Sequence, residues 1–122
     1  MTTRPVNLDL TTVRMPFTAV LSIIHRITGV IIFFGVPAFL WLFQQSLTSA
    51  EGFSQVQQLL SGGFLRFAFF GFIWAFAYHI MAGLKHLAMD LGHAETPESA
   101  KIAAAILIIG NILVLIFLGV RL

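Results

Sequence analysis

Three long apolar segments restrict what this chain can fold into. Residues 27–43 and 102–120 carry no charged side chain, and residues 64–84 are interrupted only by Arg66 and His79. A helix needs about 20 mainly apolar residues to cross the hydrocarbon core of a bilayer. Inside that core the backbone must satisfy its own hydrogen bonds, which a helix does. The sequence therefore predicts an all-α integral membrane protein with three transmembrane helices.

The composition agrees with a membrane protein and excludes several other classes. Hydrophobic residues make up 58% of the 122 residues and charged residues only 10%, too few for the polar shell of a soluble domain. Lipid or other protein chains must therefore cover the outside. The chain has no cysteine, which excludes disulfides and a thiolate-held iron–sulfur cluster within it. Its net charge of +2 is small and dispersed, so we expect no nucleic-acid partner.

We expect one membrane domain over residues 1–122. A polar tail over 1–16 precedes a first helix at about 17–43, a second at about 64–86 and a third at about 99–120. Residues 44–63 are polar and are interpreted as a connection, as are the residues around 85–101. Pro37 predicts a bend in the first helix, and Thr96 is a candidate N-cap for the third.

The positive charges predict how the helices are oriented. Arg4, Arg14 and Arg26 precede the first span, and Lys85 and Lys101 lie in the second connection, whereas the first connection has neither Lys nor Arg. Short cytoplasmic loops are enriched in Lys and Arg. This distribution places the N-terminus and the second connection in the cytoplasm and the C-terminus outside.

A first group of polar residues lies on one face of the first helix, near its cytoplasmic end. It comprises Thr18, Ser22, His25, Arg26 and Gly29. A hydroxyl, an imidazole and a guanidinium there suit a lipophilic molecule with a polar head, such as a quinone. Ser22 or Arg26 can donate to its carbonyl oxygen, and His25 or Arg26 can assist proton delivery. The alternative is that Arg26 binds lipid phosphate and His25 only marks the interface.

A second group of small and polar residues shares one face of the second helix. It comprises Gly71, Ala75, His79, Ala82, Gly83, His86 and Asp90. The small residues leave space for a bulky flat group beside His79, and haem iron accepts a neutral imidazole. His86, two turns or ~10 Å further on, suits contact with a haem propionate. The alternative is an interhelical hydrogen bond from His79 and an exposed His86. Spacing alone leaves both interpretations open.

Three segments resemble a known family. RPVNLDL at 4–10, SIIHRITGV at 22–30 and YHIMAGLKHLAMDLGH at 78–93 are similar to the cytochrome b556 membrane-anchor subunits of succinate dehydrogenase, respiratory complex II. The combination of SxxHRxTG with HxxxGxxHxxxD is more specific than either pattern alone. The resemblance extends over nearly the whole chain, in order.

The resemblance implies a subunit of a bacterial inner-membrane complex. A second membrane-anchor subunit would complete the helical bundle, and flavoprotein and iron–sulfur subunits would carry the FAD and the clusters, leaving neither on this chain. It implies that His79 is an axial ligand of haem b iron, that the second ligand comes from the other anchor, and that His86, His25 and Arg26 lie near the haem. Ser22, Arg26 and His25 would bind ubiquinone. No residue of this chain would catalyse succinate oxidation.

Two other functions remain possible at this stage. One is the haem b anchor of a fumarate reductase-type complex, because electron direction depends on the quinone and on partner subunits. The other is a structural or transport subunit without a cofactor, in which His79 packs between helices and Arg26 only sets topology.

Overall fold

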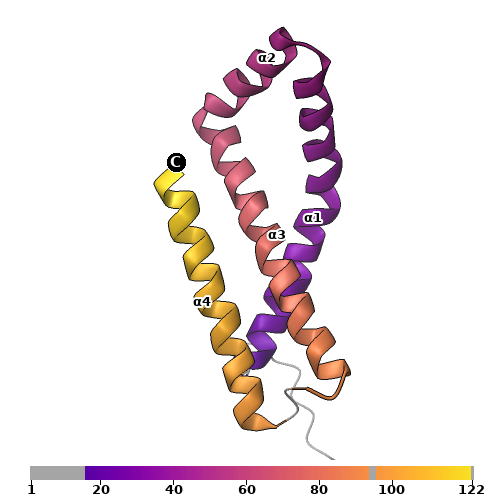
Figure 1. Cartoon of the computed structure of the whole chain (residues 1–122), viewed down its shortest axis with the longest axis vertical. Coiled ribbons are helices and arrows are strands. Elements are labelled where there is room, and N and C mark those ends of the chain that lie inside the picture. The colour runs from indigo at the N-terminus through magenta and orange to yellow at the C-terminus, as the bar shows by residue number, and fades with distance from the viewer. Residues whose placement is uncertain (1–15, 94–95, 122) are drawn as a thin grey trace, which may run out of the picture.

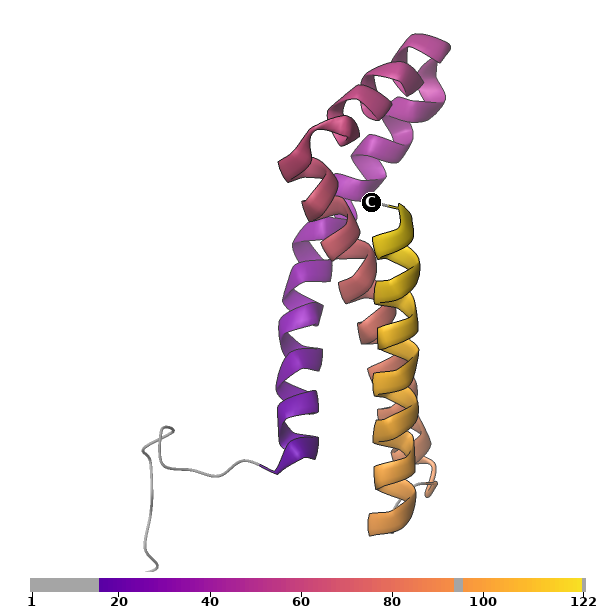
Figure 2. The same ribbon diagram turned by 90° about the vertical axis from the view of Figure 1, so that its left-hand side faces the viewer.

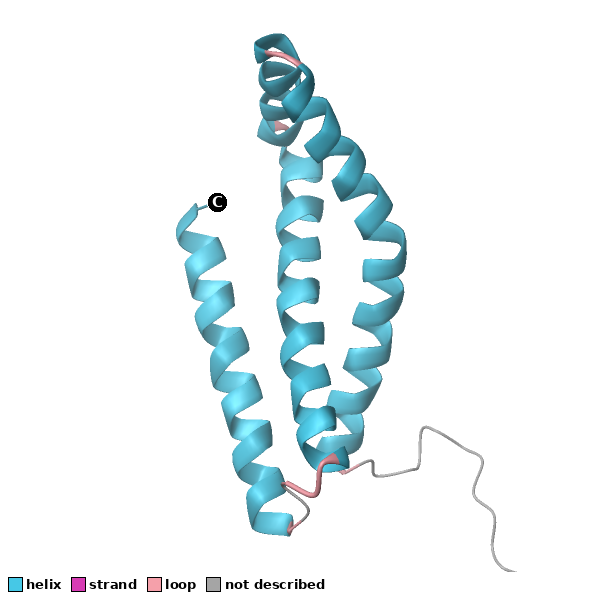
Figure 3. Ribbon diagram, turned by 45° about the vertical axis from the view of Figure 1, so that its right-hand side comes forward, coloured by secondary structure: helices cyan, strands magenta, loops and turns pink. Residues whose placement is uncertain are grey.

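The computed structural model describes residues 16–93 and 96–121, and these form four helices. The helices are α1 (Phe17–Thr48), α2 (Ala50–Ser61), α3 (Gly63–Asp90) and α4 (Pro97–Arg121). Within the described ranges there is no strand, and short turns join the helices (Figure 3). The helices α1, α3 and α4 are each long and apolar enough to cross a membrane. The predicted all-α fold with three membrane-spanning helices is confirmed.

The three long helices run lengthwise through the molecule, and α2 joins α1 to α3 at one end (Figure 1). The start of α1 and the connection between α3 and α4 lie at the opposite end (Figures 1 and 2). At the far end of α4, the Arg66 guanidinium donates a hydrogen bond to the Arg121 carbonyl over 3.1 Å. Each long helix thus crosses the molecule once.

The segment interpreted as a polar connection, 44–63, is largely helical. The helix α1 continues to Thr48 and α2 follows almost at once. Ser49 explains the restart, because its hydroxyl accepts a hydrogen bond from the Gly52 N–H over 3.0 Å. Glu51 lies in the first turn, where a negative charge favours a helix. The polar residues of this segment show that it lies beyond the apolar spans. They do not indicate a loss of helical structure.

The helix α3 ends in a sharp turn with local hydrogen bonds. Gly92 has a φ of 78°, and the His93 N–H bonds to the Ala88 carbonyl while the Gly92 N–H bonds to the Met89 carbonyl. These bonds form a Schellman motif that ends α3. The Thr96 hydroxyl then accepts from the Ser99 N–H over 3.2 Å, which confirms Thr96 as the N-cap of α4.

The core of the chain lies where α1, α3 and α4 meet. It contains Leu21 of α1, Tyr78 and Ala82 of α3, and Ala104 and Leu107 of α4. Many large apolar side chains elsewhere face outward, and Phe64 is 82% exposed. Surface of this kind is stable only against lipid or another protein. The small core and apolar exterior fit a membrane subunit with neighbouring helices.

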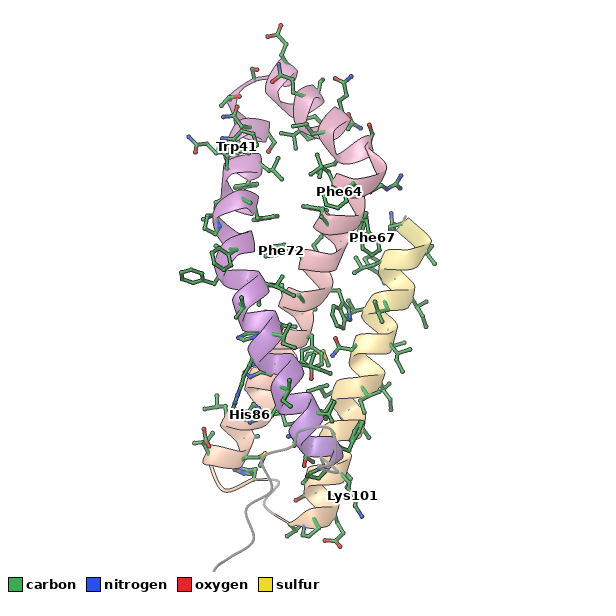
Figure 4. The ribbon with its side chains drawn as sticks, turned by 180° about the vertical axis from the view of Figure 1, so that it is seen from behind. Trp41, Phe64, Phe67, Phe72, His86 and Lys101 are labelled. Carbon is green, nitrogen blue, oxygen red and sulfur yellow. The ribbon has the colours of Figure 1, made fainter. Side chains whose placement is uncertain are left out.

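Near α2, aromatic rings hold α1 against α3. Phe39 of α1 lies 5.9 Å from Phe72 of α3 and 6.3 Å from Phe69 between ring centroids. Figure 4 shows Phe72 between the two helices. The ring of Phe72 occupies the space that a side chain on Gly35 would need. The helix α1 continues through Pro37 and its ribbon bends along its length (Figure 1).

This contact predicts that Gly35→Ala weakens the packing of α1 on α3. The added methyl overlaps the Phe72 ring, which must shift at a cost of about 1–3 kcal/mol. We expect the detergent-extracted protein to unfold at a lower temperature. Gly71→Ala is the matched control, because nothing lies within 4 Å of the Cβ it would add. Equal thermal stability of the two variants would contradict the packing described.

The fold also predicts that its two ends are reached from opposite sides of the membrane. Ser54 on α2 and Glu98 at the start of α4 are both exposed, and the chain has no cysteine to react in the background. With the orientation inferred from the charges, Ser54→Cys should react with an impermeant maleimide in intact cells. Glu98→Cys should react only after permeabilisation, with labelling of the denatured chain as the control for shielding. If both cysteine variants reacted from the same side of the membrane, the predicted three membrane crossings would be contradicted.

Candidate functional site

Three imidazoles come together where α1 crosses the second half of α3. The rings of His25 and His79 are stacked, with centroids 4.1 Å apart and planes 22° apart. The ring of His86 lies 5.2 Å from that of His25, tilted by 41°. All three side chains are half-buried, and Figure 4 places His86 in the half of the molecule opposite α2. We call these three residues the histidine cluster. The two polar groups identified in the sequence therefore form one site.

The ring of His79 is held through its Nδ1 atom. This atom lies 3.1 Å from the carbonyl oxygen of His25 and 3.2 Å from Oγ1 of Thr28. A carbonyl oxygen can only accept, so the first contact requires the proton of His79 to be on Nδ1. The Nε2 atom of the neutral ring then keeps its lone pair. The arrangement offers one neutral imidazole nitrogen to a metal centre.

Thr28 is part of this site, although the sequence analysis gave it no role. Its side chain is 1% exposed, and its hydroxyl donates to the His25 carbonyl over 2.9 Å. A threonine in a membrane helix often bonds to the carbonyl three or four residues before it, so its position alone indicates nothing more. Thr28 faces His79 because of the way α1 packs on α3, and this packing cannot be predicted from a single sequence.

Tyr78 is a second residue whose role the sequence analysis missed. It is 3% exposed, and its hydroxyl donates to the Leu21 carbonyl over 2.8 Å. This bond joins α3 to α1. It lies one helical turn before the His25 carbonyl, which accepts from His79. Because Tyr78 and His79 are adjacent, two successive side chains of α3 fix its position against α1.

Glycines keep the histidine cluster tightly packed. A Cβ on Gly29 would lie 3.1 Å from Cε1 of His79, and a Cβ on Gly83 would lie 3.8 Å from Nε2 of His25. The first distance is tighter than ordinary contact, so Gly29 is needed for the observed position of the ring. The Nε2 atom of His25 is buried and has no hydrogen-bond partner among the described residues. That atom is a polar group to which the described residues give no partner.

The expected face of small residues is not one open slot. Ala75 and Ala82 are buried, and Ala82 packs in the core with side chains of α1 and α4. Gly71 is exposed, whereas Gly83 lies against His25. The small residues were expected to leave space for a flat group beside His79, but Ala75 and Ala82 are covered by the chain itself. Helical spacing identified the face but not how much of it the chain itself covers.

Ser22 and Arg26 lie on α1 beside the histidine cluster. Ser22 is half-buried and Arg26 is exposed, one helical turn apart. Asp90 is exposed at the end of α3. Across the described ranges, no group of three or more His, Cys, Asp or Glu side chains is arranged to hold a metal ion by itself. The described side chains therefore do not form a complete metal site by themselves.

Comparisons with known proteins place this chain in a family. The family model for the succinate dehydrogenase/fumarate reductase transmembrane subunit matches residues 2–118. The succinate dehydrogenase cytochrome b556 subunit of Coxiella burnetii is 38% identical over 118 residues, covering 96% of this chain and 94% of that protein. The corresponding subunit of Paracoccus denitrificans is 31% identical over 109 residues, covering 89% and 84%.

A third relative gives a similar result. The succinate dehydrogenase cytochrome b560 subunit of Reclinomonas americana is 32% identical over 110 residues, covering 86% of this chain and 76% of that protein. The family resemblance inferred from the three sequence segments is confirmed. This chain belongs to the family of succinate dehydrogenase/fumarate reductase transmembrane subunits.

Proposed function

We propose that this chain is a membrane-anchor subunit of succinate:quinone oxidoreductase in a bacterial inner membrane. It holds haem b through His79 and forms part of the site where ubiquinone is reduced. Its N-terminus faces the cytoplasm, where flavoprotein and iron–sulfur subunits carry the FAD and the clusters. The observation that carries the proposal is the His79 ring, whose Nδ1 is fixed on the His25 carbonyl while Nε2 keeps its lone pair.

The residues of the site fit a haem in three respects. A metal-binding histidine usually donates its other ring N–H to a carbonyl or carboxylate, as the Nδ1 of His79 does. The buried Nε2 of His25 has no partner among the described residues, which suits a nearby polar group such as a propionate. His86 and Arg26 extend the polar surroundings on the same side. When bound, haem b supplies a one-electron carrier next to the quinone site.

The geometry of the histidine cluster favours a second axial ligand from another chain. Two imidazoles that hold one haem iron would each have to direct a free nitrogen at it. The rings of His25 and His79 instead lie face to face with centroids 4.1 Å apart, which leaves no room for a haem between them. His79 is therefore the one axial ligand we assign to this chain, and the second anchor subunit supplies the other.

Ser22, Arg26 and His25 are the residues we assign to ubiquinone. Reduction of a quinone adds two electrons and two protons, so its carbonyl oxygens need hydrogen-bond donors and a proton source. Ser22 and the exposed Arg26 lie one turn apart and can donate to one oxygen. His25 is next to Arg26 in sequence and can deliver a proton. If Arg26 instead binds only lipid phosphate, replacing it should have no effect on quinone reduction.

The family description names two enzymes, and this supports fumarate reductase as a second candidate. The relatives reported above are all succinate dehydrogenase subunits, which favours oxidation of succinate. Turnover of the purified complex with a high-potential quinone and with a low-potential quinone distinguishes the two. Faster fumarate reduction by the low-potential quinol would support the second candidate.

We expect His79→Leu to alter or abolish the haem signal. The α-band of the purified complex in a reduced-minus-oxidised spectrum should shift or disappear, because an axial ligand is lost. Any haem retained by the partner's ligand should have a changed potential. His93→Leu is the control, since His93 is exposed beyond the end of α3. An unchanged spectrum and potential in His79→Leu would remove His79 from the haem site, and a colourless wild-type complex would support the subunit without a cofactor.

We expect Arg26→Ala to impair quinone reduction selectively. Loss of a charged donor costs about 1.5–3 kcal/mol, or roughly 10–100-fold in kcat/KM for quinone. Succinate oxidation by an artificial acceptor that bypasses the quinone should be unchanged. Lys101→Ala makes the same charge change on an exposed residue at the start of α4 and is the control (Figure 4). Equal loss of both activities in Arg26→Ala would contradict the assignment.

A further inference from the structure

We propose that Thr28 is a positioning residue that fixes the tautomer and orientation of His79. The inference rests on the proposed function, because it concerns the histidine assigned to haem iron. Thr28 makes no contact with the iron in this role. It acts through the Nδ1 atom of His79, on the side of the ring opposite the nitrogen that would ligate.

Three polar atoms form a closed arrangement around this nitrogen. Thr28 Oγ1 is 2.9 Å from the His25 carbonyl oxygen, His79 Nδ1 is 3.1 Å from the same oxygen, and Nδ1 is 3.2 Å from Oγ1. The threonine has one hydroxyl proton, and it is donated to the carbonyl. The carbonyl has no proton to offer. The only proton left for the contact between Thr28 and His79 is the one on Nδ1, so Oγ1 accepts it together with the carbonyl.

The surroundings make this arrangement hard to change. Thr28 is 1% exposed, so no water replaces its hydroxyl, and its branched side chain has restricted rotation about χ1. The other tautomer would bring the lone pair of Nδ1 against the lone pairs of a carbonyl in an apolar environment, which is unfavourable. Gly29 lies against Cε1 of the same ring and limits its movement.

The consequence concerns the nitrogen on the far side of the ring. With the proton fixed on Nδ1, Nε2 keeps its lone pair for a metal. Acceptors that share the Nδ1 proton also make Nε2 a stronger electron donor. A stronger donor stabilises ferric over ferrous iron. Thr28 therefore sets both the availability of Nε2 and its strength as a ligand.

The test compares Thr28→Val, Thr28→Ser and Thr48→Val in the assembled, purified complex. Valine keeps the shape of threonine without the hydroxyl, and serine keeps the hydroxyl. Thr48 is the matched control, because its hydroxyl also bonds to the carbonyl three residues before it, Gln45, far from the histidine cluster. Redox titration followed by the haem absorbance gives the midpoint potential, and transfer of haem to excess apomyoglobin gives the rate of haem loss.

We expect Thr28→Val to have a more positive haem potential and to lose haem about 10-fold faster or more. Thr28→Ser and Thr48→Val should match the wild type. If Thr28→Val does not assemble, Thr28→Ala provides a hydroxyl-free variant with a smaller side chain, and the same shift is expected.

Two results would overturn the inference and leave the proposed function in place. In the first, His79→Leu alters the haem while the hydroxyl-free variants keep the wild-type potential and rate of haem loss. In the second, Thr28→Ser is as strongly affected as Thr28→Val, which would show that side-chain volume matters and the hydroxyl does not. An unaltered haem in His79→Leu would instead overturn the proposed function, and the role of Thr28 with it.

Discussion

The position of α3 against α1 depends on two main-chain carbonyl groups of α1. The carbonyls of Leu21 and His25 are one turn apart, and they accept hydrogen bonds from the adjacent residues Tyr78 and His79 of α3. Each carbonyl oxygen has two lone pairs, so it can receive a side chain in addition to the helical N–H. In a bilayer, water does not compete for these acceptors. The polar side chains of α3 therefore have few alternative partners, and the helices are held in one register.

The same constraint explains why the candidate site residues are concentrated at one end. A buried polar group in an apolar region must be paired, and each pair requires the helices to approach closely. Gly29 and Gly83 permit that approach beside the histidine cluster, and the core of Leu21, Tyr78 and Ala82 lies next to it. At the other end, α1 and α3 are separated by the ring of Phe72. At that end α1 and α3 contact each other through aromatic rings, which require no hydrogen bonds.

The sequence was sufficient to predict the spans and the helical faces, because both follow from apolar length and from a fixed helical period. It also predicted Thr96 as an N-cap, since capping depends on the next few residues. It did not predict α2, because a polar segment with a Ser cap gives a weaker signal than an apolar span. Nor did it identify Thr28 and Tyr78 as parts of the site. Thr28 contacts the ring of His79, and Tyr78 bonds to the Leu21 carbonyl. Each pair is more than 50 residues apart in sequence, so both contacts depend on tertiary packing.

The small-residue face of α3 is divided between the chain's own core and its surface. Ala75 and Ala82 are turned into this chain's own core, so they cannot also line a cofactor site. In the proposed role, His79 would bring one ligand whose Nδ1 is already held by its own chain, and the stacked His25 leaves no room for a haem between the two rings. Under the proposed function, the haem site is only half complete in the isolated chain, and a second anchor subunit would complete it.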